Sequence, residues 1–156
     1  MRAIWLVAAL AVMPPTSSQA ATPPPSQIPA PAQVLDVRLI VPCQPGDPVL
    51  VLVGDNQEFC LAKEKVFDGS GVVKVQRYPT LPKAIMEISD ATADRLYDAT
   101  LEKAGERLGF VFNGRLIFAP VIYEPVKIKE LQITLKNDPD DIDALVAAFP
   151  GTLAAK

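Results

Sequence analysis

The sequence predicts an α+β domain in which two helices pack on one side of a mostly antiparallel sheet. Three observations lead to this prediction. Short apolar runs separated by proline and glycine occupy residues 34–88, a helical periodicity follows them, and an Asn-Gly pair then joins two further apolar runs. With 156 residues and 49% hydrophobic content, the chain is long enough for one domain with a real core but not for two.

The first part of the domain has the pattern of a series of strands. Apolar residues alternate along Val34–Val41, and prolines and Gly46 interrupt the chain after it. One face of this strand carries Leu35, Val37, Leu39 and Val41. Further strands are expected at Val49–Val53, Glu58–Ala62, Val72–Arg77 and Lys83–Ile88, with a turn at Gly54-Asp55-Asn56.

A helix is expected over Ser89–Leu108, because apolar or small side chains recur there at the spacing of one helix face. Ser89 or Asp90 can cap its amino end, and Lys103 and Arg107 suit the negative end of the helix dipole. Gly105 costs such a helix about 1 kcal/mol relative to alanine. The expected face consists of Ala93, Leu96, Tyr97, Thr100, Leu101, Ala104 and Leu108.

The strongest local signal is a hairpin around Asn113-Gly114, which lies between the apolar runs Phe110–Phe112 and Leu116–Ala119. Asn-Gly favours a type I′ turn, in which both central residues need positive φ. Pro120 then interrupts the second run, and proline cannot donate to a β-ladder. The second strand is therefore expected to lie at a sheet edge, to bulge, or to leave the sheet there.

The rest of the domain is expected to be one strand and one helix. The last strand is predicted at Val126–Leu135. A helix then begins near Asn137-Asp138-Pro139, because proline is accepted in the first helical turn, and it ends at Pro150-Gly151. Its apolar face is Ile142, Leu145, Val146 and Phe149, and the domain spans residues 34–150 with a short tail at 151–156.

The first twenty residues have the features of a secretory signal peptide. Arg2 is followed by the apolar run Ile4–Val12, and Ser18-Gln19-Ala20 places small residues before a cleavage site. We expect cleavage after Ala20 and a periplasmic or secreted product without a transmembrane segment; a retained anchor is the alternative. Residues 21–33 are rich in proline and alanine and are expected to form an extended spacer, or alternatively a proline-rich recognition ligand.

The composition argues against most catalytic chemistry. The chain has no histidine, no Ser-x-x-Lys motif and no phosphate-binding or dinucleotide-binding glycine pattern, so we expect no enzyme and no cofactor. A formal charge of −3 argues against a nucleic-acid partner. The acidic group Asp138, Asp140, Asp141 and Asp143 lacks the glycine and glutamate of an EF-hand loop and fits a first helical turn, so no metal site is expected.

The two cysteines, Cys43 and Cys60, lack the Cys-x-x-Cys spacing of a redox pair. In an exported protein, two cysteines are more simply explained by one structural disulfide. We therefore expect a bridge between the end of the first strand and the strand that begins at Glu58.

The order of these motifs resembles the head of the first periplasmic domain of SecD, the accessory subunit of the bacterial Sec protein-export machinery. The matching residues are Thr100, Gly105, Leu108, Phe110–Phe112, Asn113-Gly114, Ala119-Pro120 and Ile122, with further likeness at Leu35–Ile40, Phe59–Asp68, Gln132–Thr134 and Asp141–Phe149. The chain departs from the family at Lys127–Leu131, where the family has a glycine-rich turn, and at Thr92 and Leu135, where it tends to have glycine.

The resemblance implies a non-enzymatic protein that binds an extended polypeptide or an envelope protein, with the Sec machinery as one candidate. In the family this domain is linked to transmembrane helices that couple proton flow to movement. We expect no such helices in the mature form of this chain, and we therefore do not expect it to be the motor itself. The alternative is a structural or regulatory envelope protein that reuses the fold without binding peptide, and a hydrolytic enzyme is a distant third.

The expected partner-binding edge follows the hairpin and consists of Ala119, Pro120, Val121, Ile122 and Tyr123. A strand that cannot complete its pairing leaves backbone groups to which an extended peptide can add. Alternatively, Val121 or Ile122 packs beneath the helix that begins at Ser89.

Overall fold

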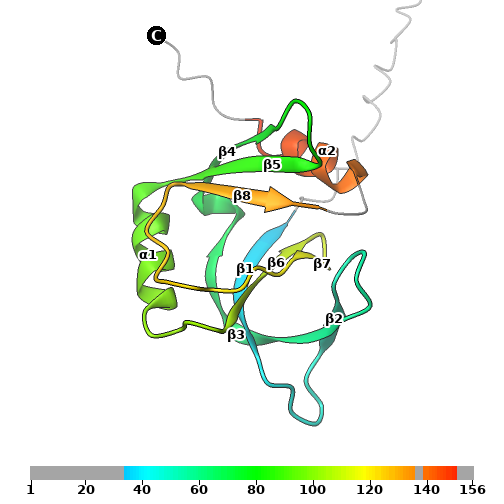
Figure 1. Cartoon of the computed structure of the whole chain (residues 1–156), viewed down its shortest axis with the longest axis vertical. Coiled ribbons are helices and arrows are strands. Elements are labelled where there is room, and N and C mark those ends of the chain that lie inside the picture. The colour runs from blue at the N-terminus through cyan, green and yellow to red at the C-terminus, as the bar shows by residue number, and fades with distance from the viewer. Residues whose placement is uncertain (1–33, 136–138, 151–156) are drawn as a thin grey trace, which may run out of the picture. The chain divides into compact units, whose positions relative to one another are not determined.

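The computed structural model describes residues 34–135 and 139–150 (Figure 1). The expected signal peptide at 1–20, the spacer at 21–33, Asp138 and the tail at 151–156 lie outside the described residues. The elements are β1 (Leu35–Val41), β2 (Val49–Val51), β3 (Glu58–Asp68), the 3₁₀ turn η1 (Gly69–Gly71), β4 (Val72–Arg77), β5 (Lys83–Ile88), α1 (Asp90–Thr100), β6 (Arg107–Phe112), β7 (Arg115–Phe118), β8 (Glu130–Thr134) and α2 (Pro139–Ala148).

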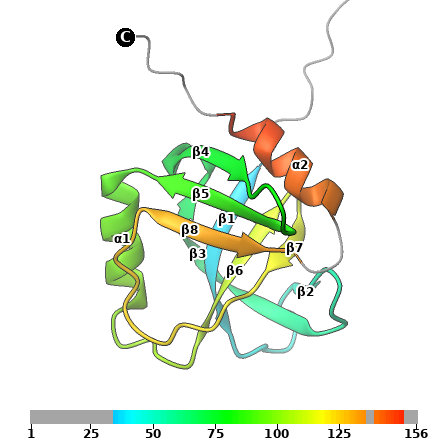
Figure 2. The same ribbon diagram turned by 45° about the horizontal axis from the view of Figure 1, so that its top comes forward.

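The α+β class is confirmed, and the described strands form two antiparallel sheets (Figure 2). One sheet has the order β2-β3-β1-β6-β7 and the other has the order β4-β5-β8. The buried core draws side chains from both sheets and both helices, and Leu35, Met86, Leu96, Ile133 and Leu145 are among its fully buried members. Strand alternation explains the face that β1 buries, since Leu35 and Val37 are inaccessible while Asp36 and Arg38 lie on the other face.

The Asn-Gly hairpin is confirmed. Asn113 and Gly114 have φ values of 50° and 79°, and they join β6 to β7. Both residues are left-handed, as a type I′ turn requires. β7 is the terminal strand of its sheet, and it ends at Phe118, before Ala119-Pro120. The start of β7 is partly covered, because the N–H of Val53 donates to the carbonyl oxygen of Leu116 at 2.9 Å.

The helix prediction is correct at its start and wrong at its end. Ser89 caps α1 by accepting a hydrogen bond from the N–H of Thr92, but the helix ends at Thr100 instead of Leu108. Glu102 and Gly105 have φ values of 57° and 90°, so the chain turns there and cannot continue as a helix. Leu108 is buried because of strand alternation in β6. Its position in the sequence also fits the spacing of a helix face, which explains why the helix was predicted to reach it.

The last strand is also shorter than predicted, because β8 begins at Glu130 instead of Val126. The preceding residues cross from the end of β7 to β8 alongside α1, as Figure 1 shows. In contrast, β4 and β5 have the predicted bounds, and α2 begins at Pro139 as expected.

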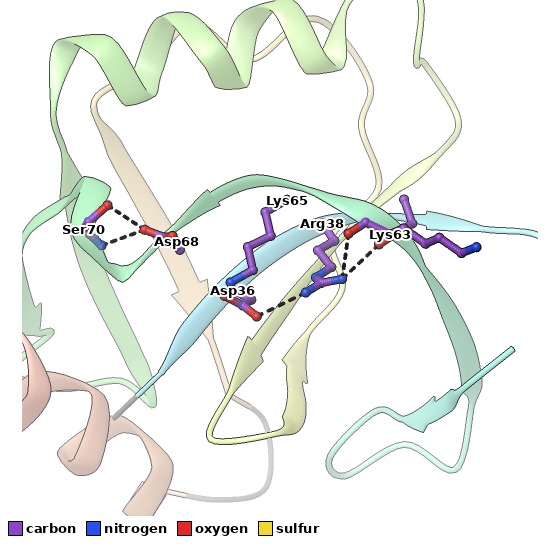
Figure 3. A network of polar contacts seen from close by, with 7 residues as sticks. Asp36, Arg38, Lys63, Lys65, Asp68 and Ser70 are labelled. Carbon is purple, nitrogen blue, oxygen red and sulfur yellow. Dashed lines mark hydrogen bonds and ion pairs between the residues drawn. The ribbon is translucent and has the colours of Figure 1, made fainter. Parts of the chain in front are cut away.

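Pairing between β1 and β3 is irregular, and Arg38 compensates for it. Arg38 pairs with Lys65 whereas Ile40 pairs with Leu61, so β3 contains extra residues between these positions. The Arg38 guanidinium donates to the carbonyl oxygens of Ala62 (3.3 Å) and Lys63 (3.0 Å) and faces Asp36 at 3.4 Å (Figure 3). The side chain thereby satisfies carbonyl groups in the irregular part of the ladder.

The turn η1 is capped by Asp68. Its carboxylate accepts hydrogen bonds from the N–H of Ser70 at 3.0 Å and from the Ser70 hydroxyl at 2.6 Å (Figure 3). These bonds stabilise the charged form and lower the pKa of Asp68 below its ordinary value.

The expected disulfide joins Cys43 and Cys60, whose Cα atoms are 5.2 Å apart. Cys60 lies in β3, where it is paired with both Val41 and Val49. The bridge therefore ties the connection between β1 and β2 to the strand that lies between them. For a sequence separation of 17 residues, restricting the unfolded chain is expected to stabilise the fold by roughly 3 kcal/mol.

Gly71 and Thr92 form a close contact between η1 and α1. A Cβ atom at Gly71 would clash with the Thr92 side chain, approaching its Cγ2 to 2.9 Å. Thr92 is fully buried, and its hydroxyl lies 2.8 Å from that of Ser89. The buried side chain of Thr92 therefore depends on a glycine across the interface.

We expect Gly71→Ala to destabilise the protein by about 1–3 kcal/mol, because the new methyl group overpacks this contact. Thr92→Ala should recover part of that loss in the double variant, since it removes the clashing atoms. Chemical denaturation of the wild type, both single variants and the double variant measures the coupling. Strictly additive effects would contradict this account of the contact.

Candidate functional site

The chain that follows β7 forms an edge beside the start of β6. The N–H of Leu108 donates to the carbonyl oxygen of Pro120 at 3.0 Å, and the N–H of Ile122 donates to that of Glu106 at 2.8 Å. The N–H of Gly105 donates in turn to the carbonyl oxygen of Ile122 at 2.7 Å. Residues 119–123 are hereafter called the edge segment. They extend the sheet beyond the end of β7 in the same register as the pair Phe110 and Phe118, but as an isolated bridge, since Pro120 has no N–H to donate to β6.

Val121 presents the free side of this edge segment. It lies opposite Arg107 in an isolated antiparallel bridge, and the hydrogen bonds fall on the residues to either side. In such a pair the N–H and C=O of Val121 point away from β6. No backbone hydrogen bond joins the Val121 N–H to another described residue. The edge segment therefore has unused backbone groups on its outer side.

The expected partner-binding residues differ in exposure. Ala119 and Ile122 are buried, with 6% and 2% of their surface accessible, and Ile122 belongs to the main core. Pro120 and Val121 are half-buried, whereas Tyr123 is 85% exposed. Ile122 can therefore offer a partner little of its side chain. Contacts with a partner would have to come from the Val121 backbone and from Tyr123.

An apolar cavity of about 270 Å³ lies beside the edge segment. Leu108, Phe110 and Phe118 line it from the sheet, and the edge segment lines it with Pro120, Val121, Ile122 and Tyr123. The remaining wall is formed mainly by apolar residues: Val126 and Ile128 on the chain that leads to β8, and Leu131 in β8 itself. The cavity, hereafter the apolar groove, places hydrophobic surface next to the unused backbone groups.

Residues 124–129, hereafter the strap, form the outer wall of the groove and are fixed along α1. The N–H of Val126 donates to the buried Thr100 hydroxyl at 2.8 Å, and this hydroxyl donates to the carbonyl oxygen of Leu96 at 2.8 Å. The Lys127 ammonium lies 5.2 Å from the centre of the Tyr97 ring. These contacts fix the strap along the length of α1.

The strap is also held at its far end. Lys129 forms an ion pair with Asp90 in the first turn of α1, and its carbonyl oxygen accepts the N–H of Ile88 at 2.9 Å. The hydrogen bond with Asp90 stabilises the charged ammonium, so the pKa of Lys129 is raised above its ordinary value.

A second cavity, of about 300 Å³, lies at the end of the edge segment nearest β7 and is more polar. Its lining includes Arg107, Ala119, Asp55, Gln57 and Thr134. Both cavities share Phe118, so they lie on either side of the same stretch of chain.

The acidic residues of α2 form ion pairs. Asp141 is 9% exposed and faces Arg115 at 2.8 Å, which connects α2 to β7. Asp143 is paired with Arg77 of β4. Among the residues that the structure describes, there is no cluster of side chains that could hold a metal ion. Neither described helix is long and apolar enough to cross a membrane.

Comparison with solved structures identifies this architecture. A structure of the membrane component SecDF, which enhances protein export, superposes with a TM-score of 0.59 at 15% identity. The match covers 80% of this chain and 65% of that one. A second SecDF structure, in the super-membrane-facing form, gives 0.58 at 15% identity, with 80% of this chain and 20% of that one covered.

The fold is SecD-like. No protein-family model matches the sequence, and no characterised protein matches it either. At this identity the likeness establishes the fold alone, and the chain spans only part of either SecDF structure. The SecD-like fold expected from the order of the motifs is confirmed, although the described strands form two sheets instead of the one expected.

Two parts of the site were not predicted from the sequence. Residues 126–129 of the strap were expected to belong to the last strand, and their attachment to Thr100, Tyr97 and Asp90 depends on the path of the chain along α1. Arg107 was expected at the end of a helix, but it lies in β6 beside the polar cavity. Only the turn at Gly105, recognised as a break, could have indicated either feature.

We expect Thr100→Val to loosen the strap, because it leaves the partly buried N–H of Val126 without its acceptor. The free energy of unfolding should fall by about 1–3 kcal/mol. Hydrogen exchange at residues 124–129 should become faster than in the wild type, and this increase should be larger than in the main core. Lys129→Gln is the matched control, since its ion pair is exposed and should contribute little. Unchanged exchange at these residues in Thr100→Val would show that the strap is held by other contacts.

Proposed function

We propose that this protein binds an extended segment of unfolded polypeptide as an added strand along the edge segment. The observation that carries the proposal is the outward-facing backbone of Val121 beside the apolar groove. Backbone hydrogen bonds give affinity for many sequences, and an adjacent groove contributes by burying apolar side chains. Such sequence-tolerant binding suits a protein that handles chains before they fold.

The proposal places the protein outside the cytoplasm, in connection with protein export. Two observations support this setting: the Cys43–Cys60 disulfide, which persists in oxidising compartments, and the SecD-like fold. SecDF itself enhances protein export. The Sec machinery or another envelope protein is the proposed context of action.

Export makes a direct prediction about the amino terminus. The protein recovered from the periplasmic fraction should begin at Ala21, because small residues at Ser18 and Ala20 favour cleavage after Ala20. Amino-terminal sequencing tests this, and thiol titration of the unreduced, denatured protein should find no free cysteine. An intact Met1 on protein that only detergent extracts would contradict the proposed export.

The binding proposal can be tested by removing one outward N–H. In Val121→Pro the new proline cannot donate to a guest strand, yet no described backbone hydrogen bond is lost. We expect it to weaken binding of the fluorescent, acetylated and amidated peptide Ser-Thr-Val-Asn-Val-Thr-Ser by roughly tenfold, measured by fluorescence anisotropy. Tyr123→Ser should also weaken binding, because it removes the most exposed aromatic ring at the groove.

The matched control is Val121→Ala, which keeps the N–H and shortens the same side chain. It should bind within about twofold of the wild type if the backbone provides the contact. Thermal unfolding confirms that each variant is folded. If the wild type binds neither this peptide nor a carboxymethylated unfolded protein, the proposal is overturned, and a structural or regulatory role in the envelope becomes the preferred alternative.

A further inference from the structure

Arg107 reaches from its own strand to the outer side of the edge segment. Its guanidinium donates to the carbonyl oxygen of Ala119 at 2.8 Å, and it lies 5.8 Å from the centre of the Phe59 ring. Phe59 provides a cation–π contact, and the carbonyl oxygen of Ala119 accepts one N–H of the guanidinium. The side chain is thereby fixed with its head in the polar cavity.

The guanidinium of Arg107 has N–H donors that form no hydrogen bond with the described residues. An arginine carries five N–H donors, and the described residues provide Arg107 with a single hydrogen-bond acceptor and no ion pair. Arg38 and Arg77, in contrast, each face a carboxylate, from Asp36 and Asp143. Asp55 lines the same cavity as Arg107 but forms no ion pair with it.

Strand geometry relates this cavity to the apolar groove. Successive side chains of a strand point to opposite faces, and paired residues of neighbouring strands share a face. Arg107 and Val121 form one such pair, so they lie on the face opposite to Leu108 and Ile122. Ala119 shares the face of Val121, and its small side chain leaves the polar cavity open.

A guest strand on the edge segment would repeat this alternation. The guest residue beside Ala119 would direct its side chain toward the polar cavity and Arg107. Its two neighbours would direct theirs toward the other face, where Leu108, Phe110 and Phe118 line the apolar groove. The two cavities would therefore be occupied by alternate residues of the same guest chain.

We propose that Arg107 selects guest segments in which an acidic residue lies between two apolar residues, the acidic residue being bound beside Ala119. This inference rests on the proposed binding of a polypeptide at the edge segment. A planar guanidinium with free N–H groups matches a carboxylate in geometry and charge. An apolar–acidic–apolar segment is thus the preferred class of client sequence.

The net charge of the protein distinguishes a specific contact at Arg107 from non-specific electrostatic attraction. The chain carries a formal charge of −3, so long-range electrostatics alone would favour basic peptides over acidic ones. A preference for acid must then come from a local contact.

The test uses three peptides, Ser-Thr-Val-X-Val-Thr-Ser, with aspartate, asparagine or lysine at X and with both termini blocked. We expect the wild type to bind the aspartate peptide roughly five- to tenfold more tightly than the asparagine peptide, and the lysine peptide most weakly. Moving the aspartate to a neighbouring position, in Ser-Thr-Asp-Val-Val-Thr-Ser, should remove the advantage. In Arg107→Gln, the ratio of the affinities for the aspartate and asparagine peptides should fall to about one. The affinity of this variant for the asparagine peptide should stay within about threefold of the wild-type value.

Because Arg107→Gln also alters the contact with Ala119, a measurement on the wild type keeps the test independent of that variant. The side-chain N–H resonance of Arg107 should shift with the aspartate peptide and stay in place with the asparagine peptide. Equal binding of the aspartate and asparagine peptides, or a preference for lysine, would overturn the role of Arg107 and leave the proposed function standing. If no peptide binds at all, both fail.

Discussion

The hydrogen bonding between Gly105–Leu108 and Pro120–Ile122 is the constraint on which the rest of the site depends. It keeps the chain beside β6 after β7 has ended, and it positions Val121 with its backbone facing outward. It also requires the chain to turn after α1, because Gly105 is both the left-handed residue of that turn and a donor in this pairing. A helix extending to Leu108 would be incompatible with it.

This pairing accounts for what the sequence could and could not predict. The Asn-Gly turn, β4 and β5, and the position of Pro120 are local signals, and the structure matches them. The end of α1 is not a local property, since Ala104 and Leu108 continue the helical spacing and only the partner strand shows that Leu108 belongs to β6. The strap was missed for the same reason, because the polar contacts that fix it are with α1 and β5.

The candidate site combines two kinds of recognition that strand geometry keeps apart. Backbone groups and an apolar groove tolerate many sequences, whereas a fixed guanidinium discriminates by charge. They can act on the same guest because the edge segment presents opposite faces at alternate residues. The strap adds rigidity at the outer wall of the groove, and its hydrogen bond to the buried Thr100 hydroxyl connects that wall to the core through α1.

The contact between Val53 and Leu116 has a consequence for solubility. A protein that keeps a strand edge open for guests also offers that edge to further copies of itself, which is a common origin of aggregation. The chain after β2 covers the edge at Leu116, and Arg107 occupies the carbonyl oxygen of Ala119. The open stretch is therefore centred on Val121, directly after Pro120, which has no N–H. A stretch this short can hold a few residues of a guest, but it is too short to support the long, regular pairing by which identical chains grow into fibrils.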